Sequence, residues 1–174
     1  LSDPSVSVSV GLTAEEQAQM NEKPKETHKS PEQIRAEWGK FLTDSGVGES
    51  TFHFFLGSEE KFLDSMEIHE DGAVSLTGDM WLDKYIEKTP IFPTKIRELR
   101  GSLYLPYLIS AEHLILPVTI DRVLALPGLT TAKYLALPKL VRNTILFGKK
   151  KLPQSDFDAL RASRPDLADK MKLE

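Results

Sequence analysis

The chain of 174 residues is long enough for one ordinary domain with tails, and 40% of its residues are hydrophobic. Its formal net charge of −4 gives it no overall attraction for nucleic-acid phosphates or anionic membranes, so we expect no nucleic-acid partner. The absence of cysteine excludes disulfides and thiolate metal sites. No stretch has the roughly 18 apolar residues that a membrane-spanning helix needs, so we expect no membrane insertion.

Residues 1–29 are predicted to be a flexible tail or linker. They are polar, mixed in charge and free of aromatic side chains, so they bury too little apolar area to offset the entropy of ordering. Val6, Val8 and Val10 alternate with serines, a pattern that a half-buried strand would also show, but the composition favours the linker. The chain begins with Leu1 instead of Met and shows no signal peptide, so we expect a processed product or a part of a longer protein.

Residues 30–66 are predicted to form an N-terminal helical cap region. Ser30 is a good N-cap, and Pro31 occupies the first helical position. The apolar residues that follow fall on one helical stripe: Ile34, Trp38, Phe41 and Leu42. Because the end of a solenoid must be covered, we expect this helix to lie over the open end of the core that follows.

An aromatic run, a short helix and a hairpin come next. The run comprises Phe52, Phe54 and Phe55, and Ser58 can cap a small helix that contains Phe62.

The hairpin is predicted where residues 70–72 separate two alternating segments. A three-residue loop with Gly72 in the left-handed region pairs Ile68 with Val74 and places the apolar side chains on one face. A two-residue loop would set apolar against polar side chains.

Two tandem units of 21 residues, 99–119 and 120–140, are the most specific feature of the sequence. They share the pattern LxLPxLxxAxxLxLP and differ mostly between the shared positions, as a repeated core with a variable surface would. The identical pairs are Leu103/Leu124, Leu105/Leu126, Pro106/Pro127, Leu108/Leu129, Ala111/Ala132, Leu114/Leu135, Leu116/Leu137 and Pro117/Pro138.

Partial units are predicted on both sides of the clear repeats. In 141–153, the columns of Leu99, Leu103 and Leu105 continue through three residues: Val141, Ile145 and Phe147. In 74–98, Val74 and Leu76 followed by Ile91-Phe92-Pro93 fit the pattern only with an insertion of about five residues. The solenoid therefore spans 67–153.

The spacing of the shared leucines predicts short strands. The triplets LYL, LAL and ILF each point two side chains inward and one outward, and strands this short are stable only when stacked in a parallel sheet.

Residues 154–174 are predicted to be a C-terminal helical cap that starts at Ser155 or Asp156 and is split by Pro165. The apolar residues of this cap should cover the last coil; they are Phe157, Leu160, Leu167 and Met171. The predicted fold class is therefore α+β: a short β-solenoid with a parallel sheet, capped by a helix at each end.

This pattern resembles the leucine-rich-repeat superfamily, and within it the short bacterial LxLP type. The resemblance covers 74–153 and is strongest over 99–138. The asparagine or cysteine that usually follows the strand is absent, and Leu108 and Leu129 stand near its place. The resemblance implies a leucine-rich-repeat-like protein-binding scaffold without a catalytic residue, belonging to a larger bacterial surface or effector protein. The sequence leaves its location open between the cytoplasm and secretion or delivery.

The candidate partner surface is a set of residues between the inward leucines. Tyr104, Ala125 and Leu146 should stack on the outer face of the sheet. Arg100 and Arg142 should stack at its entrance, and Arg122 beside them; aromatic and arginine side chains dominate interface hot spots. The alternative is that the N-terminal helix or the tail covers this face.

No catalytic, metal or cofactor site is expected. The histidines are His28, His53, His69 and His113, and no two of them have metal-ligand spacing on one element. His69 is interpreted as a solvated hairpin tip, and His113 as variable surface, because the other repeat has a tyrosine there. The run 149–151 of three lysines fits a solvated turn that protects the last sheet edge.

The sequence therefore favours a non-catalytic protein-protein interaction module that binds an unidentified protein and is a monomer or self-associates weakly. One alternative is a regulatory or substrate-recruiting part of an enzyme, with the catalytic region elsewhere or in 30–98. Against it, a stretch this short without a convergent polar motif is thin for an active site. The second alternative is a structural or assembly subunit.

Overall fold

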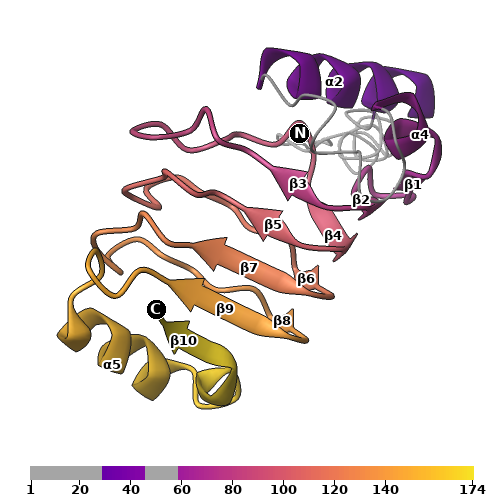
Figure 1. Cartoon of the computed structure of the whole chain (residues 1–174). Coiled ribbons are helices and arrows are strands. Elements are labelled where there is room, and N and C mark those ends of the chain that lie inside the picture. The colour runs from indigo at the N-terminus through magenta and orange to yellow at the C-terminus, as the bar shows by residue number, and fades with distance from the viewer. Residues whose placement is uncertain (1–28, 46–58) are drawn as a thin grey trace, which may run out of the picture. The chain divides into compact units, whose positions relative to one another are not determined.

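The computed structural model describes residues 29–45 and 59–174, and Pro31–Glu174 form one compact unit (Figure 1). The aromatic run that includes Phe52 lies outside the described residues. The helices are α2 (Pro31–Asp44), α4 (Glu59–Asp64), α5 (Gln154–Ser163) and the 3₁₀ helix η2 (Ala168–Lys170). The strands are β1 (Glu67–Ile68), β2 (Val74–Thr77), β3 (Met80–Trp81), β4 (Ile96–Arg100), β5 (Leu103–Tyr104), β6 (Thr119–Ile120), β7 (Val123–Leu126), β8 (Leu140–Val141), β9 (Thr144–Phe147) and β10 (Met171–Leu173).

The strands stack into two sheets instead of the single sheet that the sequence predicted. Sheet A has the order β1-β2-β4-β6-β8, and sheet B has the order β10-β9-β7-β5-β3. Each coil gives one strand to each sheet and turns between them at a short corner, such as Gly101–Ser102 between β4 and β5. All neighbours are parallel except β1 and β2. The predicted parallel β-solenoid with a helix before and after it is confirmed.

The register confirms the predicted columns of the clear repeats. Leu103 pairs with Leu124, which pairs with Ile145, so one leucine column becomes the inner row of sheet B. The column that begins at Leu99 runs through Ile120 and Val141 and forms the inner row of sheet A. These side chains are all buried in one hydrophobic core, so both sheets point the repeated residues at the same interior.

The first coil corrects the predicted insertion. Leu76 pairs with Leu99 and Met80 pairs with Leu103, at a spacing of 23 residues, so this coil is two residues longer than the clear repeats. A register shift between Val74 and Ser75 accommodates one of the extra residues. The prediction of about five failed because Met80-Trp81-Leu82-Asp83 occupies the LxLP place with methionine instead of the first leucine and aspartate instead of the proline.

Helix α2 caps the first coil as predicted. Ile34, Trp38 and Leu42 are buried on its inner stripe. The Trp38 ring stacks on Phe92, in the arc of the first coil, with ring centroids 5.9 Å apart, and its Nε1–H donates to Thr94 Oγ1 at 3.0 Å. The helix therefore closes the N-terminal end of the core through a long-range aromatic contact.

The hairpin between β1 and β2 matches the predicted three-residue loop. Ile68 pairs with Val74, the His69 N–H donates to the Ala73 carbonyl, and Gly72 has a φ of +86°. Glycine suits this position because it has no Cβ to clash in the left-handed region.

The C-terminal cap differs from the prediction after α5. Phe157 and Leu160 are the buried residues of α5, as expected. Met171, however, lies in β10, which pairs with β9. Pro165 prevents α5 from continuing, and the chain then returns as a strand. Sheet B therefore extends to Leu173, and the edge of β9 is covered by β10 instead of the lysine run.

We predict that Gly101→Ala lowers the free energy of unfolding by about 1–3 kcal/mol, which is the usual cost of inserting a methyl group into a tightly packed site. A Cβ on Gly101 would lie 2.1 Å from the carbonyl oxygen of Gly78, so the stacked corners would have to separate. Gly39→Ala, inside α2, is the matched control, since its Cβ would meet only side-chain ends at ordinary contact distances, of Leu63 at 3.5 Å and Glu59 at 4.0 Å. The control should gain about 0.5–1 kcal/mol from helix propensity. Urea unfolding of both variants tests this, and similar stabilities for the two would contradict it.

Candidate binding surface

The outer face of sheet B carries a continuous column of side chains, which we call the outer column. The register of sheet B defines its members: Trp81, Tyr104, Ala125, Leu146 and Lys172. The Trp81 and Tyr104 rings lie 4.9 Å apart at 33°, and the Trp81 side chain is 45% exposed. Aromatic rings on a hydrogen-bonded sheet are held with little freedom to lose on binding.

The structure brings together three of the predicted site residues in this column. Tyr104, Ala125 and Leu146 occupy successive strands at matching positions. Ala125 is only 4% exposed, so it forms the floor of the column between its larger neighbours. Trp81 was not among the predicted residues, because the repeat pattern does not align the first coil on Met80. The alternation of Met80, Trp81 and Leu82 was the signal that could have revealed it.

The corner beside the outer column is held by side chains that cap the next coil. Asp79 Oδ1 accepts a hydrogen bond from the Ser102 N–H at 2.7 Å, and Ser102 Oγ accepts one from the Val123 N–H at 3.0 Å. Burial raises the pKa of the Asp79 carboxyl, while the Ser102 hydrogen bond and the positive charge of Arg122 oppose the rise. The predicted site residue Arg122 therefore acts electrostatically on this corner.

We predict that Asp79→Asn removes a pH-dependent destabilisation. The pKa of Asp79 is higher in the folded protein than its ordinary value of 3.8, so the folded state binds the proton more tightly. This contribution to stability is present at acid pH and is lost as the pH rises through the raised pKa. Asparagine keeps an oxygen that can accept from the Ser102 N–H. The free energy of unfolding of the variant should therefore rise relative to that of wild type between pH 4 and pH 7, as measured by urea unfolding. A difference between the two proteins that does not change with pH would contradict the raised pKa of Asp79.

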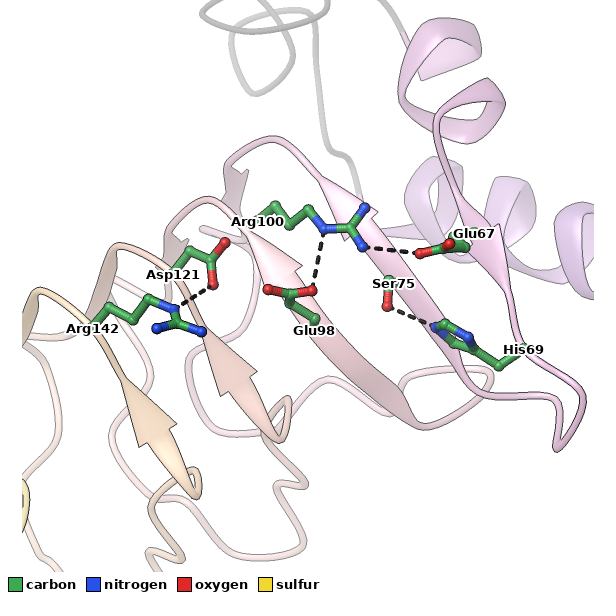
Figure 2. Close-up of polar contacts among 7 residues, drawn as sticks. All are labelled: Glu67, His69, Ser75, Glu98, Arg100, Asp121 and Arg142. Carbon is green, nitrogen blue, oxygen red and sulfur yellow. Dashed lines mark hydrogen bonds and ion pairs between the residues drawn. The ribbon is translucent and has the colours of Figure 1, made fainter.

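Arg100 and Arg142 do not join the outer column. Arg100 lies on sheet A, where its guanidinium contacts Glu67 at 2.9 Å and Glu98 at 3.2 Å, and Arg142 contacts Asp121 at 3.3 Å (Figure 2). The hydrogen bond and charge of Arg100 lower the pKa of Glu67. Of the six predicted residues, Tyr104, Ala125 and Leu146 therefore lie in sheet B, Arg100 ends β4 of sheet A, and Arg122 and Arg142 lie in the corners that follow β6 and β8. Carboxylates neutralise Arg100 and Arg142.

His69 and Ser75 also meet on sheet A, and their geometry corrects the interpretation of His69 as a solvated tip. The His69 Nε2 and Ser75 Oγ atoms lie 2.8 Å apart (Figure 2). A serine next to a histidine can be a nucleophile with its base. Here Ser75 is only 2% exposed, and the nearby carboxylate of Glu67 is bound to Arg100. A substrate therefore has no access to the hydroxyl, and we assign the pair to the packing of the hairpin.

The described residues contain no group of three or more histidine, aspartate or glutamate side chains arranged to hold a metal ion. Over residues 29–45 and 59–174, none of the helices has the length and apolar character needed to cross a membrane.

Comparison with known proteins gives no assignment. No family model, curated protein or solved structure matches the chain. The resemblance to leucine-rich repeats therefore stays a prediction that rests on the sequence pattern, and function has to be argued from the surfaces of the solenoid.

Proposed function

We propose that this chain is a non-catalytic recognition module that binds another protein through the outer column of sheet B. The observation that carries the proposal is the exposed Trp81 ring stacked on Tyr104, with Leu146 two strands further along the same face. Tryptophan and tyrosine are enriched among the residues that dominate binding energy. By the sequence resemblance, the module is the leucine-rich-repeat part of a larger bacterial surface or effector protein.

The rigidity of the solenoid supports this role. Both ends of its core are covered, by α2 through Trp38 and by α5 through Phe157, and the corners are held by side-chain caps such as Asp79. A surface built on strands keeps its geometry in the free protein, which reduces the cost of ordering on binding. The polar contacts on sheet A, by contrast, are satisfied within the chain and offer less to a partner.

Affinity capture from cell lysate with mass spectrometry tests the proposal, using wild type, Tyr104→Asp and Tyr107→Asp. Tyr107 is the matched control because it is exposed but lies outside the outer column. A protein held by wild type and Tyr107→Asp, and lost from folded Tyr104→Asp, is the expected result. Retention by both variants would reject the outer column, and the absence of any specific partner would reject the recognition role. Circular dichroism establishes that each variant is folded.

A further inference from the structure

The arcs that join β5 to β6 and β3 to β4 enclose an apolar groove on a different part of the solenoid, which we call the arc groove. Its volume is about 490 Å³. Its lining is mostly apolar and includes Ile91, Phe92, Ile115 and Leu116, together with Lys95 and His113. Ile91 is 79% exposed and Ile115 is 74% exposed, so two large aliphatic side chains stand in water beside the groove. Adjoining exposed apolar residues of this kind mark interaction sites.

The backbone of the arcs carries strain at one lining residue. His113 has a φ of +68°, and Tyr134, at the same place in the next repeat, has a φ of +72°. Each is the third residue of a turn closed by a hydrogen bond, from the Leu114 N–H to the Ala111 carbonyl in the first arc and from the Leu135 N–H to the Ala132 carbonyl in the second. Glycine or asparagine would fit these positions with less strain. The strain is common to both repeats, and the two positions differ in that the exposed His113 side chain lines the groove, whereas Tyr134 does not.

The charge of the groove indicates what it binds. Among the described residues that line it, Lys95 and His113 are the only ionisable side chains, and no carboxylate lines it. Glu112 lies 3.9 Å from His113 but is outside the lining. The Thr89 hydroxyl donates to the Glu112 carbonyl at 2.9 Å and ties the two arcs together, so the groove is already formed in the free chain. Its volume suits a few side chains of a peptide rather than a folded surface.

We infer that the arc groove binds an extended segment of a partner protein that places apolar side chains against Ile91 and Ile115 and a carboxylate near Lys95. This second interaction surface is independent of the outer column. Burial of the two exposed isoleucines supplies the driving force, and the lysine selects acidic over basic segments.

Selection of short random peptides displayed on phage against the full chain tests this inference. The expected peptides combine apolar residues with an aspartate or glutamate. A synthetic copy should bind Ile115→Asp about tenfold more weakly or worse, the loss typical of a binding hot spot. Its affinity for Tyr104→Asp should equal that for wild type. No enrichment, enrichment of basic peptides, or equal affinity for Ile115→Asp would overturn the inference.

A charge exchange and a pair of glycine variants separate specific binding from loss of folding. Lys95→Glu should weaken binding of the acidic peptide and favour the same peptide with lysine in place of its carboxylate. His113→Gly and Tyr134→Gly should both raise the midpoint of thermal unfolding, because both relieve a positive φ. Only His113→Gly should weaken peptide binding, since Tyr134 does not line the groove. Affinity insensitive to both Lys95→Glu and His113→Gly would refute the proposed acidic ligand.

Discussion

Trp38→Ala is expected to lower the free energy of unfolding by about 3–5 kcal/mol, the usual cost of removing a buried tryptophan. Trp38 is fully buried, its ring contacts Phe41 and Phe92, and its indole N–H donates to Thr94. The variant loses the apolar contact and the hydrogen bond together, and it opens the end of the core that α2 covers. Urea unfolding measures the loss.

The position of the damage distinguishes a cap from an ordinary core residue. In a solenoid each coil contacts mainly its neighbours, so the loss of a cap weakens the nearest coil most. Hydrogen exchange in Trp38→Ala should therefore accelerate in β2 and β4 more than in β9. Trp38→Phe is the control, because it keeps an aromatic ring on Phe92 and should cost much less than the alanine variant. A loss below about 1 kcal/mol for Trp38→Ala would show that α2 does not hold the core closed.

The parts of the fold that the sequence predicts are those where burial repeats at a fixed spacing. Leu103, Leu124 and Ile145 stack because their spacing of 21 residues is the length of one coil. The stripe of α2 is equally clear, since Ile34, Trp38 and Leu42 return at helical spacing to the core side. In both cases one periodic rule fixes which side chains point inward.

The sequence does not predict the parts of the fold where the spacing of apolar residues fits two structures equally well, such as one sheet or two, and a helix or a strand. Leu99 and Leu103 belong to different sheets, but the corner between them at Gly101–Ser102 has no proline and interrupts the strand by only two residues. The last strand was missed because Met171 continues the helical spacing of the residues before Pro165. After that proline the chain forms β10, so tertiary pairing with β9 overrides the local pattern.

The candidate site follows the same division. The stacking of Tyr104, Ala125 and Leu146 follows from the repeat alone, because residues in one register share one face. The separation of Arg100 from them depends on the corner, which turns the chain from sheet A to sheet B. The arc groove could not be predicted, since it depends on the backbone conformation at His113 and on contacts between two arcs of different length.

Leu126→Ala is expected to lower the free energy of unfolding by about 2–5 kcal/mol, because it leaves a cavity in the centre of the solenoid. Leu126 is fully buried and pairs with Phe147 in the next coil, so neighbouring strands cannot collapse into the space without moving the stack. Tyr104→Ala is the matched comparison on the opposite side of sheet B. It loses one partly exposed ring contact with Trp81, which is worth about 0.5–1.5 kcal/mol.

The two variants together separate the interior of the solenoid from its binding face. If Leu126→Ala costs several times more than Tyr104→Ala, the leucine supports the core while the tyrosine remains available to a partner. Equal losses would mean that Tyr104 is itself a structural residue, and the outer column would then have little free energy to offer on binding. Urea unfolding at one pH and temperature decides this before any partner is known, because it asks only which face of sheet B the fold depends on.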